Sequence, residues 1–212
     1  RNGDFCENSC KQDWCISKQK DFVKGWIPDP EIEVGYGNIY SDSLGKERVV
    51  ELAPSCNSCI KQSIPNLKAG SYQLKFEWGA RKGRNFDDSK FEVYFDGKKI
   101  KSLNPCDYKV HTETIDIDVK TDCQNEEVKF CAVGKANSYG AFIKSVSLRR
   151  KPVVSNPKPV DPPVPSNPYP NPPIYNPPVV NPPVYNPPVY NPPVVTPPGI
   201  YLESHSGQCL QR

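Results

Sequence analysis

The sequence predicts an all-β protein, a disulfide-rich jelly-roll β-sandwich followed by an extended polyproline II segment. Apolar and polar residues alternate through residues 48–149, which is the period of strands with one buried face. The chain carries nine cysteines, and twenty of its 25 prolines follow Lys151. The foldable part is therefore residues 1–150, which is enough for one domain with one core.

The strands can be assigned in order from this alternation. In the clearest case, Tyr72, Leu74, Phe76 and Trp78 share one face of a half-buried strand. Asp96-Gly97 is typical of a hairpin turn between two strands. Many short strands separated by Gly, Asn, Asp and Pro predict a sandwich or jelly roll, with no amphipathic helix. The expected strands cover residues 49–52, 58–64, 71–78, 91–95, 98–103, 115–119, 128–132 and 142–148.

The cysteines predict disulfides and an oxidising compartment. Zinc binding is one alternative, but Cys56-x-x-Cys59 has no second C-x-x-C pair to complete a four-thiolate site. Thioredoxin-type redox chemistry is another, but that motif opens a helix, and this region has a strand pattern. Eight cysteines in the first domain allow up to four bridges of open connectivity. The first 47 residues are irregular, so we expect an insertion held by its bridges rather than by core packing. The candidates are Cys6, Cys10, Cys15, Cys56, Cys59, Cys106, Cys123 and Cys131.

Charge and hydropathy exclude two classes of partner. The formal net charge of +3 is spread along the chain, and no basic run interleaved with aromatics indicates nucleic-acid binding. No apolar stretch approaches the roughly 20 residues of a membrane span. Methionine is absent, so we expect Arg1 to be the start of a processed, secreted chain located outside the cell or on its surface.

An ordered series of short motifs resembles a known fold. The series includes Asn2-Gly3-Asp4-Phe5, Gly25-Trp26, Ala69-Gly70-Ser71-Tyr72 and Tyr139-Gly140-Ala141-Phe142-Ile143. It is similar to the galactose-binding-like β-sandwich of DUF642-type extracellular domains and related carbohydrate-binding modules, and it covers residues 1–150. Relatives carry Glu and Asp where this chain has Cys6 and Lys144. We therefore expect no structural calcium. The sequence indicates no other metal and no cofactor.

The resemblance directs attention to residues that could bind sugars. An aromatic ring stacks on a sugar, and a guanidinium binds pairs of hydroxyls, which makes Arg81, Tyr139, Trp78 and Trp26 the candidates. Core packing is the alternative for both tryptophans, since Trp78 shares its face with three apolar residues. No catalytic constellation is present, because the alternation of Asp116 and Asp118 is explained by a polar strand face. The chain is not expected to be an enzyme.

The segment 151–199 is predicted to be a polyproline II stalk. Its pentads NPPIY, NPPVV, NPPVY, NPPVY and NPPVV begin at Asn171, and paired prolines impose extended geometry over roughly 145 Å. No charge occurs between Pro162 and Leu202, so we consider both a spacer and an assembly element. The repeats resemble proline-rich cell-wall proteins, which implies proline hydroxylation and glycosylation. The tyrosines expected to serve assembly are Tyr169, Tyr175, Tyr185 and Tyr190.

In the tail, residues 200–212, the stretch Ser206-Gly207-Gln208-Cys209-Leu210 is similar to the opening of a ricin-type β-trefoil repeat, and the tail could begin another domain. Cys209 is the odd cysteine, expected to bridge to another subunit, to that next domain or back to the head. The sequence favours a structural glycoprotein of an extracellular filament, coat or cell-surface appendage, with itself or other extracellular structural proteins as partners. The alternative is a carbohydrate-binding, lectin-like adhesion module on a rigid spacer, with glycans as partners.

Overall fold

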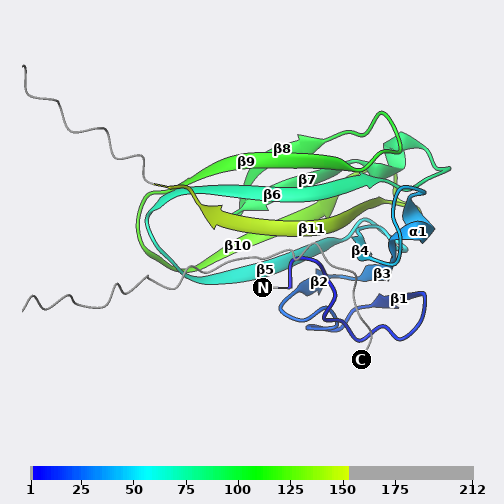
Figure 1. Cartoon of the computed structure of the whole chain (residues 1–212), viewed down its shortest axis with the longest axis horizontal. Helices are drawn as coiled ribbons and strands as arrows, with labels where there is room; N and C mark the ends of the chain where they lie inside the picture. Colours follow the sequence, from blue (N-terminus) through cyan, green and yellow to red (C-terminus); the bar gives the residue numbers. More distant parts are fainter. Residues whose placement is uncertain (1, 153–212) are drawn as a thin grey trace, which may run out of the picture. The chain divides into compact units, whose positions relative to one another are not determined.

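A computed structural model of the chain describes residues 2–152, which form two antiparallel β-sheets packed face to face (Figure 1). This agrees with the predicted all-β sandwich. The predicted polyproline segment and the tail lie outside the described residues from 153 onwards, and so do Cys209, Tyr169, Tyr175, Tyr185 and Tyr190.

The larger sheet has six strands in the order β1-β3-β4-β11-β6-β9, and the smaller has five in the order β2-β5-β10-β7-β8. The six strands are β1 (Trp14–Ser17), β3 (Ile32–Tyr36), β4 (Arg48–Glu51), β11 (Ala141–Arg150), β6 (Gly70–Ala80) and β9 (His111–Val119). The five are β2 (Ile27–Asp29), β5 (Cys59–Leu67), β10 (Cys123–Ala132), β7 (Phe91–Phe95) and β8 (Lys98–Leu103). A short helix α1 (Gly37–Tyr40) and a 3-10 helix η1 (Phe86–Ser89) complete the fold.

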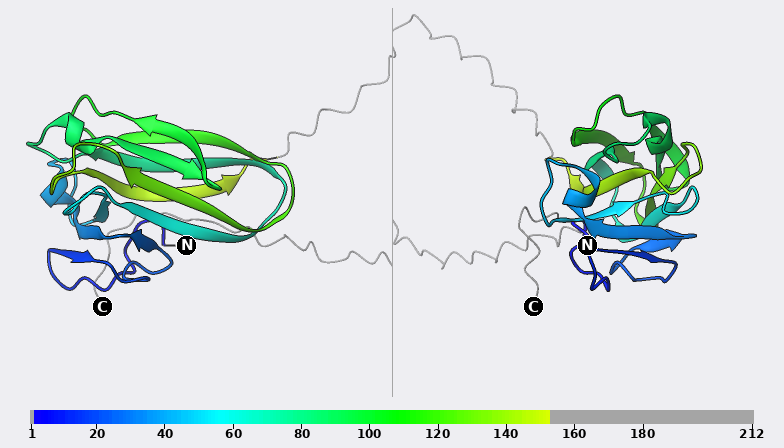
Figure 2. Two further views of the ribbon diagram at one scale, coloured as in Figure 1. Left: turned by 180° about the vertical axis from the view of Figure 1, so that it is seen from behind. Right: turned by 90° about the vertical axis from the view of Figure 1, so that its right-hand side faces the viewer.

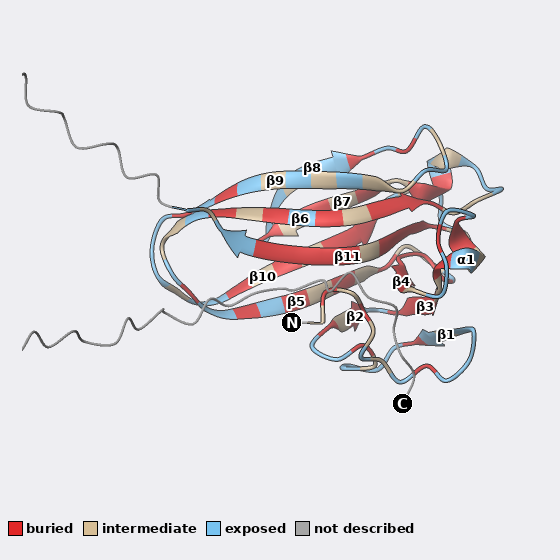
Figure 3. Ribbon diagram, viewed as in Figure 1, coloured by how far each residue is buried: buried red, intermediate tan, exposed pale blue. Residues whose placement is uncertain are grey.

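Strand alternation forms the core as the sequence predicted. Along β6 the side chains of Tyr72, Leu74, Phe76 and Trp78 are buried between the sheets, and β6 lies between β11 and β9 (Figure 3). The hairpin predicted at Asp96-Gly97 joins β7 to β8, and both turn residues have positive φ, as a two-residue hairpin requires.

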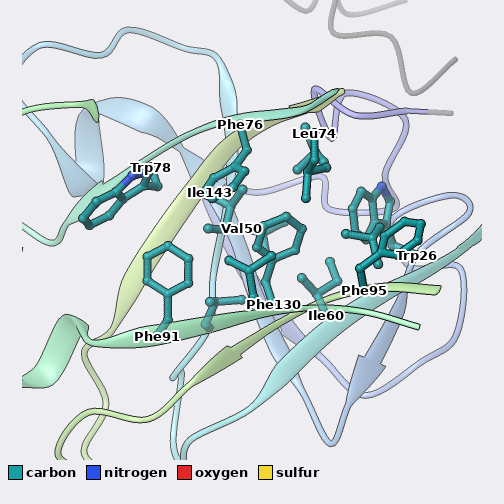
Figure 4. Close-up of a cluster of buried hydrophobic side chains, with 14 of the residues drawn as sticks. Trp26, Val50, Ile60, Leu74, Phe76, Trp78, Phe91, Phe95, Phe130 and Ile143 are labelled. Atoms are coloured by element: carbon teal, nitrogen blue, oxygen red, sulfur yellow. The ribbon is translucent and has the colours of Figure 1, made fainter. Parts of the chain in front are cut away.

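Both tryptophans proposed for sugar binding lie in this core (Figure 4). Trp26 is fully buried against Phe5 and Phe130, and its indole nitrogen donates to the backbone oxygen of Asn2 at 3.0 Å. Trp78 packs edge-on against Phe91. Because their rings are enclosed by other side chains, neither can stack on a ligand, and the core interpretation is correct for both.

The expectation for the first 47 residues was wrong. Phe5, Val23, Ile32 and Val34 are almost completely buried in the same core as β6, and β1 and β3 are strands of the six-stranded sheet. The segment is therefore held by core packing and strand pairing in addition to its disulfide. Its apolar residues arrive through loops and short strands, so they show no regular period along the sequence.

Two disulfides join described residues, Cys10 with Cys15 and Cys59 with Cys131. Cys56, Cys106 and Cys123, which the sequence also made candidates, carry free thiols. Cys123 is the first residue of β10, at the opposite end of the sandwich from Cys56 and Cys106, and its Sγ donates to the backbone oxygen of Thr121 at 3.1 Å. This separation removes Cys123 from the reach of the other two thiols.

The two ends of the sandwich differ in their connections (Figure 2). At one end, here called the turn end, two or three residues join β5 to β6, β7 to β8 and β9 to β10. At the other, here called the loop end, β4 and β6 finish while β7, β9 and β11 begin, and the connections are longer. Long loops on a rigid scaffold are where binding residues concentrate.

Candidate functional site

Arg81 follows β6 directly at the loop end and is held by two buried carboxylates. Its Nη1 lies 3.3 Å from Glu33 Oε1 and also contacts Glu51 Oε2. Glu51 is fully buried, whereas the Arg81 side chain keeps 18% of its surface exposed. The guanidinium is thus fixed from below and partly open to solvent, as a preorganised hydrogen-bond donor requires.

Tyr40, at the end of α1, completes this network. Its hydroxyl donates to Glu33 Oε1 at 2.7 Å, and the Arg81 guanidinium lies 5.0 Å from the centre of its ring. The ring packs directly over Gly35 in β3, where no side chain would fit, and against Phe142. A glycine on the strand therefore lets α1 approach the sheet closely enough to bring Tyr40 to the carboxylates.

Burial changes the titration of this cluster. Desolvation raises the pKa of Glu51 to about 8, and repulsion from Glu33 adds to the rise, against the attraction of Arg81. Desolvation also raises the pKa of Tyr40, with Glu33 contributing. Burial lowers the pKa of the Arg81 guanidinium, but Glu51 and Glu33 outweigh it and the net pKa is raised. Glu33 and Glu51 thus share the guanidinium of Arg81. Glu51 keeps its proton to a higher pH than a solvent-exposed glutamate does.

Tyr139 lies above this network on the loop between β10 and β11. The Cζ atoms of Arg81 and Arg84 lie 5.2 Å and 3.4 Å from the centre of its ring. Gly140, the next residue, donates its backbone N–H to Glu51 Oε1, so one carboxylate holds both Arg81 and the Tyr139 loop. Tyr139 is partly exposed and Arg84 is exposed, which leaves this aromatic–guanidinium group accessible at the surface.

An open cleft of about 630 Å³ lies beside this group. Tyr108, on the loop before β9, contributes an exposed aromatic ring to it, packs against Phe86 and donates its hydroxyl to the backbone oxygen of Arg84 at 2.6 Å. Arg84 therefore connects the cleft with Tyr139. The lining residues are Ser41, Asp42, Ser43, Leu44, Glu77, Lys82, Asp107, Tyr108, Lys109, Val110 and Lys144.

Four of the charged side chains that line the cleft form two ion pairs. Lys82 Nζ lies 2.6 Å from Asp42 Oδ1, and Lys144 Nζ lies 3.2 Å from Glu77 Oε2. Asp107 accepts from the backbone N–H of Lys109 and lies 2.7 Å from His111 Nε2, which together lower the pKa of its carboxyl. Such pairs hold both donors and acceptors in place, which suits a ligand rich in hydroxyl groups.

The structure brings together two of the four predicted sugar-binding residues, Arg81 and Tyr139. Sequence reasoning missed Arg84, Tyr108, Glu33 and Glu51. The turn Arg81-Lys82-Gly83-Arg84 that follows a strong strand pattern could have indicated Arg84. The carboxylates could not be found this way, since Glu33 and Glu51 lie 48 and 30 residues before Arg81.

Residues 2–152 contain no group of three or more His, Cys, Asp or Glu side chains placed to hold a metal ion. Within the same residues, no helix is long and apolar enough to cross a membrane.

No protein-family model matches the chain, and no curated protein matches it. Several solved structures are similar, and carbohydrate-binding modules are prominent among them. A family 35 carbohydrate-binding module from Clostridium thermocellum is 13% identical, with 64% of this chain and 91% of that chain covered and a TM-score of 0.39.

Two further modules have comparable scores. The family 35 module from Paenibacillus barcinonensis is 14% identical, covering 65% of this chain and 98% of that chain with a TM-score of 0.40. The module TmCBM61, solved in complex with β-1,4-galactotriose, is 18% identical, covering 65% of this chain and 88% of that chain with a TM-score of 0.42. Because all three TM-scores are below 0.5, the function proposed below rests on the geometry of the loop end.

Proposed function

We propose that the described domain binds a carbohydrate at the loop end, across the surface formed by Tyr139, Arg84 and Tyr108. The observation that carries the proposal is the pairing of Tyr139 with Arg84, whose guanidinium lies over the ring at 3.4 Å beside an open polar cleft. Aromatic rings pack against the C–H faces of sugars, and guanidinium groups bind adjacent hydroxyls.

The contacts below this surface support a preorganised site. Arg81 is fixed by Glu33 and Glu51, and Glu51 also holds the backbone of Gly140 beside Tyr139. A site whose groups are already ordered loses less conformational entropy when a ligand binds. Burying the Glu51 carboxyl group costs desolvation energy, and the ordering of Arg81 and Gly140 by this group accounts for its presence here.

The proposal is binding without catalysis. A glycosidase needs two accessible carboxyl groups across the scissile bond, one of them with a raised pKa. Glu51 has the raised pKa but is fully buried beneath Arg81. In the cleft, Asp42 and Glu77 are engaged by lysines, and the pKa of Asp107 is lowered. Since its disulfides form in oxidising compartments, we place this binding domain outside the cell or at its surface.

The test is a glycan array with the full chain, followed by calorimetric titration of the best ligand. Tyr139→Ala should weaken binding about tenfold or more, because it removes a stacking ring. Tyr108→Ala and Arg84→Ala should each weaken it by a smaller factor. Tyr94→Ala is the matched control, since Tyr94 lies on β7 in the other sheet, where it bonds to Glu92.

Two results would reject the proposal. One is the absence of any ligand among neutral and acidic plant, animal and microbial glycans. The other is a ligand whose affinity is unchanged in Tyr139→Ala and in Tyr108→Ala, which would place binding elsewhere on the domain.

A further inference from the structure

The outermost strand of the six-stranded sheet exposes two large apolar side chains. Among the described residues β1 pairs with β3 alone, and Trp14 and Ile16 alternate along it with 50% and 43% of their surfaces exposed. Alternate residues of a strand point to the same side. We call Trp14 and Ile16 together the β1 edge; in Figure 3 this strand is coloured as largely exposed.

The β1 edge is well ordered despite its exposure. The disulfide between Cys10 and Cys15 closes the loop that leads into it. Arg48 donates to the backbone oxygens of Cys10 and Gln12, each at 3.2 Å, and its guanidinium lies over the ring of Tyr36 at 3.8 Å. The two side chains are thus presented on a fixed strand and not on a frayed terminus.

Exposed edge strands normally carry charges or prolines that prevent association. Here the exposed positions hold a tryptophan and an isoleucine, and within residues 2–152 the indole N–H of Trp14 has no hydrogen-bond partner. An exposed indole ring with a free donor beside a second apolar side chain is the kind of surface that proline-rich segments recognise, since proline carbonyls accept from the indole while the rings pack on it.

We propose that the β1 edge binds the proline-rich repeat, residues 171–195, of a second copy of this chain. The repeat contains five pentads with paired prolines, ends each pentad in Tyr or Val, and carries no charge. Its prolines lack N–H groups, so it cannot extend the sheet, but its carbonyls can accept from Trp14. The paired prolines predict a stiff segment, which favours a neighbour over its own head. Repeated pentads offer several equivalent binding registers, which raises the apparent affinity by a statistical factor.

The experiment is sedimentation velocity of the full chain over a dilution series, without glycan. The wild-type chain should self-associate as its concentration rises. Trp14→Ser with Ile16→Ser should weaken this association about tenfold or more, which is the scale of a buried apolar hot spot. Val133→Ser is the matched control, because Val133 is also a large exposed apolar residue, 46% exposed, and lies on the loop after β10. It should associate like the wild type.

A competition step identifies the occupant. A synthetic peptide of residues 181–195 should dissociate the complex, whereas the same peptide with alanine at every proline should not. Association that survives the proline peptide would overturn the proposal, because another surface would then fill the β1 edge. A wild-type chain that stays monomeric at its solubility limit, or a double variant that associates normally, would also overturn it. Near-UV circular dichroism from Trp26 and Trp78 reports folding, and Ile16→Ser alone serves if the double variant is unfolded.

Discussion

The ion pairs at the two ends of the sandwich differ in how deeply they are buried. At the turn end Lys68 pairs with Asp122 at 2.9 Å, and both side chains are more than half exposed. At the loop end Arg81 pairs with Glu33 and Glu51, of which Glu51 is fully buried. Strand β6 of the six-stranded sheet runs from one end to the other. The difference therefore lies in the connections at each end and not in the strand itself.

The loop end contains a buried charged cluster that is costly to desolvate and that fixes the side chains above it. Exposed pairs contribute little, while buried charges cost desolvation energy unless they are well paired. At the turn end the pair Lys68–Asp122 is exposed. The other end keeps buried charges below Tyr139, where we propose that a ligand binds. The predictions below test whether this contrast is real, beginning with the largest expected effect.

The largest expected effect comes from the disulfide that joins β5 to β10 at the loop end. Replacing Cys59 and Cys131 by serine should lower the free energy of unfolding by about 4 kcal/mol, because the bridge spans 72 residues and restricts the unfolded chain. Denaturant titration followed by circular dichroism measures this. At the turn end, Cys123→Ser should change stability by less than about 0.5 kcal/mol, since that thiol is free. Equal losses for both would contradict the contrast.

Arg81→Ala should follow, with a loss of about 3 kcal/mol at pH 9, where Glu51 is ionised and would be left buried without its cation. Adding Glu51→Gln to Arg81→Ala should recover part of the loss, since the buried charge is then removed. The double-mutant cycle of unfolding free energies measures this coupling. Additive effects would mean that the two side chains do not interact in solution.

The pH dependence of stability should also distinguish the two ends. The pKa of Glu51 is raised in the folded state, so its contribution is fully present below about pH 4.5 and is lost as pH rises through about 8. Stability should therefore decline between pH 5 and pH 9, by at most about 1.4 kcal/mol per pH unit from this group.

Glu51→Gln should flatten that decline, which denaturation midpoints at several pH values would reveal. The control is Asp122→Asn at the turn end. The Ala69 amide and Lys68 lower the pKa of Asp122, so its contribution is lost only in acid and the variant should keep the slope. A slope that persists in Glu51→Gln would mean that another group takes up the proton.

How far the sequence predicted this fold depends on how regular each region is. β6 and the Asp96-Gly97 hairpin follow local rules, the period of a strand and the chemistry of a turn, and both were predicted. The first 47 residues were misjudged because β2 has only three residues and β1 only four. Such strands are too short to show a period, and Phe5 and Trp26 are buried from loops.

The candidate site shows a second limit of sequence reasoning. Residue chemistry selected Arg81 and Tyr139, and it also selected Trp78 and Trp26, which the structure buries. The carboxylates that fix Arg81 come from β3 and β4, so only strand pairing places them beside it. The exposed Trp14 was missed because its segment was assigned to an irregular insertion, where exposure has no sequence signal.

Among the charge pairs, the smallest expected effect is at the turn end, where Lys68→Ala should change the free energy of unfolding by less than about 1 kcal/mol. The Lys68 ammonium is well exposed, so water solvates it almost as well as Asp122 does, and salt screens the attraction between them. Asp122 also accepts from the backbone N–H of Ala69 at 2.8 Å, and this contact remains in the variant. Denaturation at low and high salt separates the contributions, because the small effect of Lys68→Ala should vanish in high salt. A loss approaching that of Arg81→Ala would show that burial does not account for the difference between the two ends.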